Sequence, residues 1–233
     1  RIINYTNVCW VRCKFCSFYR PPRDAEGYLL SDEQILQKIE ELVQQGGVEV
    51  LIQGGLNPKL KIDYFERLFR TIKQHYPQVI IHGLSPAEIL YIAHISRLSL
   101  RDCLLRLKEA GLNSVPGAGG EILVDRVRKE IAPYKDTTQQ WLDFMREVHQ
   151  LGMRSSASMM FGHVETLEER VEHLIRLREL QDETGGFTAF ICWNFQPEGT
   201  ALSHLPKATA YDYLRTVAVA RLMLDNFDHI QAS

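Results

Sequence analysis

Short apolar runs alternate with amphipathic segments along most of the 233 residues of the chain. The apolar runs begin near positions 2, 48, 79, 112, 154, 187 and 229, and their length is typical of buried strands. Between them, apolar residues recur at helical spacing, in segments that several glycine pairs and a proline bring to an end. This order of elements predicts a repeat of strand and helix, which packs either as a parallel open sheet or as a barrel.

Three of the predicted helices begin with serine or threonine followed three residues later by glutamine or glutamate. In such a capping box, each side chain accepts a hydrogen bond from the backbone N–H of the other residue. The three pairs are Ser31 with Gln34, Thr137 with Gln140, and Thr166 with Glu169. Further helices are predicted over residues 65–76, 86–96, 100–110 and 209–226.

Polar and glycine-rich segments follow most of the predicted strands, at residues 53–55, 82–86, 116–121, 162–166 and 196–200. One face built from the ends of several strands is typical of a β/α barrel, and the first strand is not followed by the G-x-G-x-x-G of a dinucleotide-binding sheet. We therefore expect an α/β fold, a partial TIM-like β/α barrel of parallel strands with outer helices, forming one domain over residues 1–233. Because the chain opens at Arg1 and ends in a strand-like run, we expect a segment of a longer protein that lacks both termini.

Composition and charge narrow the class of protein. Hydrophobic residues make up 45% of the chain and charged residues 24%, which are values of an ordinary globular domain. The formal net charge of −2 disfavours nucleic acid or an anionic membrane surface as the main partner. No apolar run approaches the roughly 18 residues that cross a bilayer. We therefore expect a main partner of another kind, and the cysteine usage described next predicts a cytoplasmic location.

Three of the five cysteines, Cys9, Cys13 and Cys16, fall within eight residues. Clustered thiols in a chain with few cysteines indicate a metal site in a reducing compartment rather than disulfides. Three thiolates can hold three irons of a [4Fe–4S] cluster and leave the fourth iron open for a ligand. A zinc site would need a fourth ligand close by, and the nearest histidine is His75. Chance grouping of buried cysteines is the remaining alternative.

The spacing Cys-x-x-x-Cys-x-Phe-Cys, with Phe15 as the aromatic residue, resembles the radical S-adenosylmethionine (SAM) superfamily. The resemblance implies a [4Fe–4S] cluster on the three cysteines, with SAM bound to the open iron. It also implies reductive cleavage of SAM to a 5′-deoxyadenosyl radical, which abstracts hydrogen from the substrate. Phe15, inside the cysteine segment, is then expected to contribute to cofactor binding.

Further segments resemble secondary motifs of that superfamily. Gly54 and Gly55, after the second predicted strand, resemble the glycine pair whose backbone meets the SAM amino group, and glycine allows such a close approach. Residues 161–165 follow the fifth strand, where the superfamily contacts adenine. Glu121, after the fourth strand, is our candidate for the SAM ribose hydroxyls, because a carboxylate accepts two hydrogen bonds. The alternative for Glu121 is an ordinary acidic residue near a helix start.

Longer stretches narrow the resemblance to the cyclic dehypoxanthine futalosine synthase family, on the futalosine route to menaquinone. These stretches are residues 4–9, 16–22, 26–28, 120–127, 159–166 and 180–191. The resemblance implies a radical SAM oxidoreductase that takes hydrogen from the sugar of dehypoxanthine futalosine and joins that carbon to the benzoate ring. It also implies a reductant such as flavodoxin or ferredoxin. Asn57 and Cys192 stand where the family more often carries histidine and proline, so no role is carried over to them.

The ring closure that the resemblance implies ends with the loss of a proton. His163 and Glu165 are the candidates for its removal, and the ordinary pKa of histidine, near 6.5, suits this task. Gln53 and His82 follow neighbouring strands, and we predict that they line the substrate side of the cavity.

Three other interpretations stay open on the sequence. A sibling radical SAM enzyme, aminofutalosine synthase or a deazaflavin (F0) synthase subunit, would join two substrates instead of cyclising one. A non-catalytic iron–sulfur or zinc module would use the cysteines structurally, although no fourth ligand is near them. A phosphate-binding barrel enzyme would use residues 116–120 as an anion loop and would leave the three cysteines unexplained.

Overall fold

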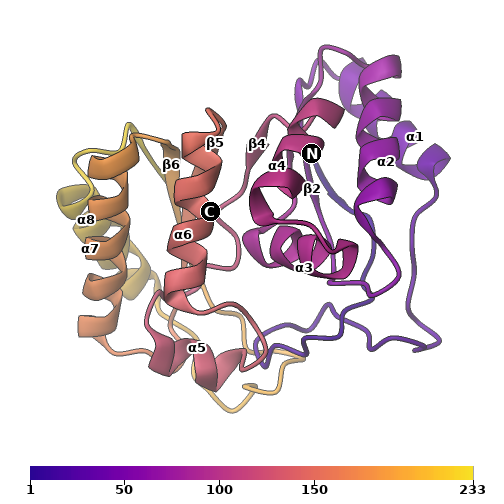
Figure 1. Ribbon diagram of the computed structural model, residues 1–233. Helices are drawn as coiled ribbons and strands as arrows, with labels where there is room; N and C mark the ends of the chain where they lie inside the picture. Colours follow the sequence, from indigo (N-terminus) through magenta and orange to yellow (C-terminus); the bar gives the residue numbers. More distant parts are fainter. Residues whose placement is uncertain (233) are drawn as a thin grey trace. The chain divides into compact units, whose positions relative to one another are not determined.

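The computed structural model describes residues 1–232, and they fall into two compact units. Unit 1 comprises Arg1–Trp10 and Phe18–Pro116, and unit 2 comprises Val11–Ser17 and the chain from Gly117 onward. Strands and helices alternate in both units, as the sequence pattern predicts (Figure 1). A single domain over residues 1–233 stays a prediction, and Ser233 lies outside the described residues.

Unit 1 contains four parallel strands that pair in chain order. One or two helices connect each strand to the next, as a parallel sheet requires. The strands are β1 (Ile2–Asn4), β2 (Glu49–Gln53), β3 (Ile80–Gly83) and β4 (Ser114–Val115). The helices are α1 (Asp32–Gln44), α2 (Ile62–His75), α3 (Pro86–Ser96) and α4 (Leu100–Ala110).

Side chains of the unit 1 strands alternate between two faces of the sheet. Ile3, Val50 and Ile52 are at most 1% exposed and belong to the core of the unit. Their neighbours Ile2 and Ile80, on the opposite face, are 62% and 40% exposed. One face of this sheet is therefore packed, and the other carries accessible side chains.

Unit 2 contains three parallel strands, with β6 between β5 and β7. Helices α6 and α7 lie side by side, as do α7 and α8, on the left of Figure 1. The strands are β5 (Arg154–Phe161), β6 (Phe187–Asn194) and β7 (His229–Ala232). The helices are α5 (Asp125–Ile131), α6 (Thr138–Gln150), α7 (Leu167–Thr184) and α8 (Ala210–Met223).

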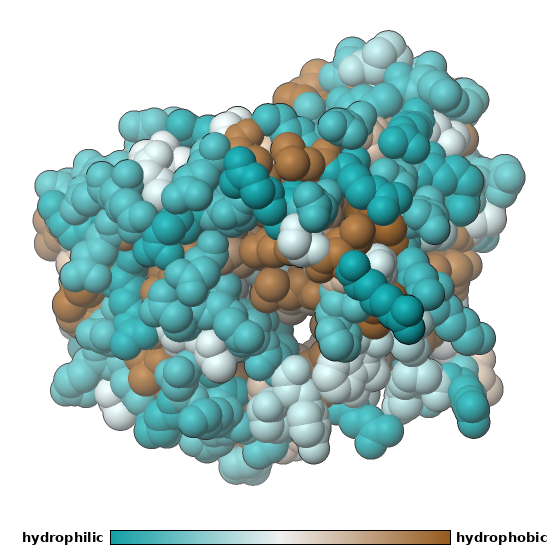
Figure 2. Space-filling view, in the orientation of Figure 1, coloured by the Kyte–Doolittle hydropathy of each residue, from teal (hydrophilic) through white to brown (hydrophobic). Residues whose placement is uncertain are grey.

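Aromatic rings fill the core of unit 2. The ring of Phe187 stacks on Trp141 at 6.3 Å and on Phe227 at 5.3 Å between centroids. The outward side of α6 and α7 is mainly hydrophilic (Figure 2) and carries ion pairs such as Arg146 with Glu183, at 2.6 Å. This division between apolar inner and charged outer faces is what the helical periodicity predicts.

The three predicted capping boxes form, and a fourth, Ser85 with Glu88, opens α3. Helix α7 ends at Gly185 in the left-handed conformation that glycine adopts easily. The short helix α5 was not predicted, because its N-cap residue Val124 makes no side-chain cap and leaves no start signal in the sequence. Among the described residues, none of the helices combines the length and apolar character needed to span a membrane.

Candidate cofactor and substrate site

Cys9 follows β1 on a segment that neighbouring stretches of unit 1 hold in place. Its backbone N–H donates to the carbonyl of Arg20 at 2.9 Å, and the N–H of Arg20 donates to the carbonyl of Asn7 at 2.8 Å. Gly55 packs against this segment: a Cβ at Gly55 would lie 2.3 Å from the Val8 carbonyl oxygen and 2.8 Å from the Cβ of Cys9. Any side chain at this position would therefore displace the backbone beside Cys9.

Cys13 and Cys16 lie in one turn of unit 2, where the N–H of Cys16 donates to the carbonyl of Cys13 at 3.2 Å. Lys14, between them, anchors the turn through its backbone. Its N–H donates to the carbonyl of Ile131 at 2.8 Å, and its carbonyl accepts from the N–H of Ala201 at 3.0 Å. The end of α5 and the loop after β6 thus fix the cysteine segment.

The donor set fits an iron–sulfur cluster with one open iron. All five cysteines are thiols, and the three in the motif offer the soft ligands that iron–sulfur clusters use. Burial raises the pKa of Cys103 and of Cys192 to about 12, which keeps these two thiols protonated and makes them poor ligands. Within residues 1–232, no three His, Cys, Asp or Glu side chains form a group that could hold a single metal ion.

A buried glutamate holds Gly54. The N–H of Gly54 and the hydroxyl of Tyr5 both donate to Oε1 of Glu88, at 2.9 and 2.8 Å. Oε2 of Glu88 accepts from the N–H and the hydroxyl of Ser85, each at 2.7 Å. Burial raises the pKa of Glu88, and these hydrogen bonds act in the opposite direction. The glycine predicted to meet SAM is therefore fixed from one side by a carboxylate.

Glu121 lies in the loop before α5, with a φ of +34° and 7% of its side chain exposed. Nζ of Lys135 binds both of its carboxylate oxygens, at 3.0 and 3.2 Å. Nη1 of Arg128 donates to the carbonyls of Gly119 and Gly120, each at 2.9 Å, and thereby fixes the preceding loop. An ionised carboxylate has about four acceptor positions, so Glu121 keeps acceptor capacity for a further donor.

Gln53 and His82, both predicted for the substrate side, lie on the accessible face of the unit 1 sheet. His82 is the register partner of Leu51, so Gln53 lies one side-chain step closer to the carboxyl ends of the strands. Nδ1 of His82 lies 2.7 Å from Oγ of Ser114. On the neighbouring strand β1, Asn4 is the register partner of Gln53. Burial lowers the pKa of His82 to about 4, so its ring is neutral near pH 7. Asn4 and Ser114 extend this polar row and were not predicted.

Glu165 is the centre of a buried polar cluster before α7. It accepts hydrogen bonds from the backbone N–H groups of Gly162 and His163, at 2.6 and 2.9 Å, and from Nε of Arg170, at 2.8 Å. Arg170 also donates to Asp212 at 3.1 Å. The carboxylate therefore orders the loop that carries both candidates for proton removal.

The tautomer of His163 follows from its contacts. Nε2 lies 3.0 Å from the carbonyl of Met160, which can only accept, so Nε2 carries the ring proton. Nδ1 is then the basic nitrogen, and it lies 3.2 Å from Oε2 of Glu165 without the alignment of a hydrogen bond. Burial lowers the pKa of His163, although the Glu165 charge acts in the opposite direction. The two candidates thus form a neutral imidazole beside a carboxylate.

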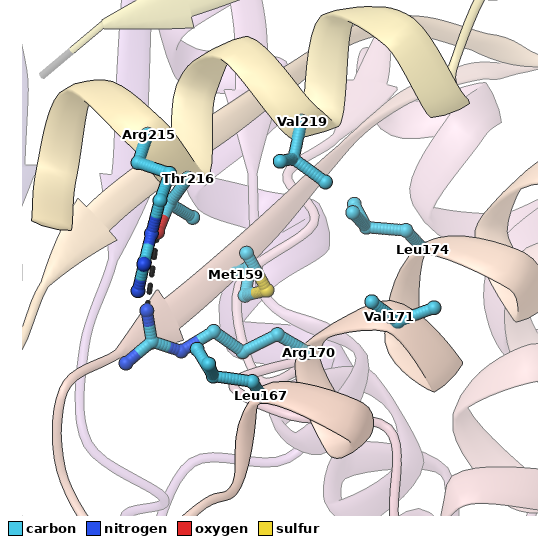
Figure 3. A pocket seen from close by; sticks show the side chains of 8 residues that line it. All are labelled: Met159, Leu167, Arg170, Val171, Leu174, Arg215, Thr216 and Val219. Atoms are coloured by element: carbon cyan, nitrogen blue, oxygen red, sulfur yellow. Dashed lines mark hydrogen bonds between the residues drawn. The ribbon is translucent and has the colours of Figure 1, made fainter.

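A cavity of about 250 Å³ lies between α7 and α8 (Figure 3). Met159, Leu174 and Val219 form its apolar wall. Arg170 lies at one end, where its Nη1 donates to the hydroxyl of Thr216 at 3.1 Å. The cavity includes none of the residues that the sequence analysis assigns to cluster, SAM or substrate.

Lys135, Glu88 and Tyr5 are part of the candidate site and were not predicted. Glu88 had a signal that could have revealed it, because it stands three residues after Ser85 at a helix start. Lys135 had none, since a single lysine in a loop is usually a solvated surface residue. Tyr5 had only its place at the end of the first apolar run.

The fold and the cysteine segment define a class of protein. Residues 3–177 match the radical SAM superfamily, and the chain belongs to this superfamily. Residues 184–233 match the family described as the CofH/MqnC C-terminal region.

Among curated proteins, the chain is similar to cyclic dehypoxanthine futalosine synthase. It is 48% identical to that of Halalkalibacterium halodurans, covering 100% of the chain and 63% of the relative, and 44% identical to that of Streptomyces coelicolor, covering 100% and 59%. Aminodeoxyfutalosine synthase of Thermus thermophilus is 42% identical, covering 98% of the chain and 63% of the relative. The chain thus spans about three-fifths of the length of these relatives.

Solved structures confirm the predicted fold class, the partial β/α barrel of radical SAM enzymes. Methylornithine synthase matches with a TM-score of 0.78 at 18% identity, covering 98% of this chain and 63% of that one. The [FeFe]-hydrogenase maturase of Carboxydothermus hydrogenoformans matches with a TM-score of 0.73 at 17% identity, covering 100% and 53%. At these identities the likeness concerns the fold alone.

Proposed function

We propose that the chain is the radical SAM core of an enzyme that converts dehypoxanthine futalosine to its cyclic product in menaquinone biosynthesis. The chain is more similar in sequence to the cyclases of two organisms, at 48% and 44% identity, than to the aminodeoxyfutalosine synthase, at 42%. The observation that carries the proposal is local. Cys9, the first thiol of the cysteine motif, stands beside a glycine pair whose packing against Tyr5, Val8 and Cys9 itself leaves no room for side chains.

Cys9, Cys13 and Cys16 would hold the [4Fe–4S] cluster, with Phe15 beside it, and the backbone of Gly54 and Gly55 would receive the SAM amino group. When bound, the cluster and SAM supply one electron and the means to abstract a hydrogen atom. Gly54 is held for this role by Glu88. Such preorganisation lowers the entropy lost when the reacting groups are aligned.

Glu121 would accept hydrogen bonds from the SAM ribose. Two contacts with Lys135 already orient its carboxylate, so little side-chain entropy is lost when the ribose binds. The loop around it is fixed by Arg128 and by the N–H of Met160, which donates to the Glu121 carbonyl at 3.1 Å.

The polar row on the unit 1 sheet would face the substrate. Gln53 stands at the carboxyl end of β2, Ile2 and Leu51 are level with His82, and Ile80 lies one step further toward the amino ends on the same face. A neutral His82, hydrogen-bonded to a serine, can orient a sugar hydroxyl without carrying a charge. The apolar side chains of Ile2, Leu51 and Ile80 around it suit an aromatic ring.

In ring closure the substrate would give one hydrogen atom to the 5′-deoxyadenosyl radical, one proton to a base and one electron to an acceptor, and would gain one carbon–carbon bond. The oxidised iron–sulfur cluster would serve as that electron acceptor. His163 would accept the proton on Nδ1, and Glu165 beside it would stabilise the resulting imidazolium. A small-molecule substrate, a reductant such as flavodoxin or ferredoxin and a cytoplasmic location complete the proposal, with no role for nucleic acid or membrane.

The test is an anaerobic assay of the full-length protein with reconstituted iron, dithionite, SAM and dehypoxanthine futalosine, read by mass spectrometry. We expect a product two hydrogens lighter than the substrate, formed together with 5′-deoxyadenosine. Formation of deoxyadenosine without that product would contradict the assignment of the substrate but support the assignment to radical SAM enzymes. A protein with an intact cluster that forms neither would overturn the proposal in favour of a structural iron–sulfur module.

The second candidate is a sibling that joins two substrates, which the 42% identity to aminodeoxyfutalosine synthase supports. Adding an enolpyruvyl benzoate to the same assay separates the two. If turnover occurs only when the enolpyruvyl benzoate is present, the protein is the sibling enzyme and not the cyclase.

A further inference from the structure

Lys135 is a lysine whose ammonium lies inside unit 2. Its side chain is 10% exposed, and Nζ binds both carboxylate oxygens of Glu121. The same Nζ lies 5.7 Å from the centre of the Phe15 ring, a distance at which a cation and an aromatic face attract. Phe15 stands between Cys13 and Cys16 in the chain. One ammonium therefore touches the loop before α5 and the cysteine segment.

The surrounding charges are matched in pairs. Arg128 binds the side chain of Asp136 at 2.7 Å through Nη2, and Lys135 binds Glu121. Burial lowers the pKa of Lys135, but the charges of Glu121, Cys13 and Asp136 outweigh it and bring the pKa to about 12. Its ion pair with both oxygens of Glu121 therefore holds the ammonium charged near pH 7.

We propose that Lys135 is a positioning residue that places a fixed positive charge beside the cysteine segment and so favours the reduced state of the cluster held there. The proposal rests on the proposed function in one respect, that these cysteines bind a [4Fe–4S] cluster. It does not depend on which substrate the enzyme takes.

The physical reason is the sign of the charge that reduction adds. One electron makes the cluster with its thiolates more negative, and a cation within a few ångströms stabilises that state most strongly where water is excluded. Glu121 opposes this effect, because its negative charge is paired with the same ammonium. Removing Lys135 and removing the charge of Glu121 should therefore shift the reduction potential in opposite directions.

The experiment is a redox titration of the reconstituted full-length protein without SAM or substrate, followed by the EPR signal of the reduced cluster. Three variants are compared with the natural sequence: K135M, which keeps an apolar stem, K135R, which keeps the charge, and E121Q. The control is K207M, which removes an exposed lysine that pairs with Glu198 in the same unit. We expect a more negative midpoint for K135M, a less negative one for E121Q, and unchanged values for K135R and K207M.

Two results would overturn the inference. Either K135M titrates at the natural midpoint, or K135M and E121Q shift it in the same direction, as a general loosening of the loop would do. If K135M fails to take up iron, the E121Q and K135R variants still test the proposal. A midpoint reduction potential of E121Q that equals or is more negative than that of the natural protein contradicts it. If the reduction potentials shift with the expected signs but the protein makes no cyclic product, the inference about Lys135 is supported and the proposed substrate is contradicted.

Discussion

The hydroxyl of Tyr5 donates a hydrogen bond of 2.8 Å to the carboxylate of Glu88, 83 residues further along the chain. The same carboxylate oxygen accepts the N–H of Gly54. A residue from β1's end, one from the loop after β2 and one from the first turn of α3 are thus joined at a single buried atom.

Removing this carboxylate should destabilise unit 1. E88A removes the buried acceptor of three donors: the N–H of Gly54, the hydroxyl of Tyr5 and the N–H of Ser85. Each unsatisfied donor costs about 1–3 kcal/mol of stability, and water that enters the site recovers part of this cost. We expect E88A to lower the free energy of unfolding by at least 3 kcal/mol in urea titrations. Q140A, which removes the equivalent residue of an exposed capping box, should cost no more than about 1 kcal/mol. Equal losses would show that Glu88 acts only as a cap.

Single cysteine substitutions should separate cluster ligands from buried thiols. We expect C9A, C13A and C16A each to lose the iron and the visible absorption of the reconstituted protein, because three thiolates leave no spare ligand. C103A should keep both and lose only about 1 kcal/mol of stability, since Cys103 is a buried thiol without a cluster role. Full iron content in any of the three motif variants would contradict its assignment.

The substitution G55A tests the close packing beside Cys9. A methyl group would lie 2.3 Å from a backbone oxygen, so the chain must move and the cysteine with it. We expect a loss of several kcal/mol in unfolding experiments and weaker SAM binding in the EPR spectrum. G185A is the control, because its Cβ meets nothing within 4 Å and only its φ of +59° causes strain, at about 1 kcal/mol. A stable G55A protein with unchanged SAM binding would refute this role.

His173 should make the protein sensitive to acid. Burial, with smaller effects from Arg128 and Arg176, lowers its pKa from 6.5 to about 3, so below pH 6.5 the unfolded chain binds a proton that the folded chain does not. The free energy of unfolding should fall as the pH falls through this window, by about 1.4 kcal/mol per pH unit for this one group. H173Q, whose amide oxygen can still accept from Leu123, should flatten the dependence by that amount. Parallel pH profiles for H173Q and the natural protein would contradict this.

Arg170 should matter through Glu165. In R170M the buried carboxylate loses the arginine that pairs with it, and breaking such a pair costs about 3–5 kcal/mol. We expect the double variant R170M/E165Q to recover a large part of that loss, because a neutral amide needs no counter-charge. A double-mutant cycle in urea measures the coupling. Strict additivity of the two changes would show that the ion pair is not the source of the stability.

The sequence predicted most of the scaffold because its signals are local. The apolar runs gave each of the strands, and the capping boxes at Ser31, Thr137 and Thr166 marked three helix starts. Helix α5 escaped because it has seven residues and no capping side chain, and its place depends on tertiary contacts of Arg128. Short helices stabilised from outside leave little trace in periodicity.

The site was predictable only where a motif concentrates its residues. The three cysteines and the glycine pair carry their own spacing, and Gln53 and His82 follow from strand ends. Lys135 contacts residues 14 and 120 positions away, and Tyr5 contacts one 83 positions away, so no local sequence pattern reveals these pairs. The roles of His163, Glu165 and Glu121 stay predictions, now with defined tautomer and partners.

The capping box of α7 has a consequence for how this scaffold can change. Thr166 and Glu169 satisfy each other's backbone N–H, so the helix begins at the same residue whatever stands in the loop before it. That loop, residues 162–165, carries the candidate groups for proton transfer. Substitutions there would change the candidate groups while the helix keeps its register, so we expect this short stretch to be where a different reaction is acquired, in evolution or by engineering.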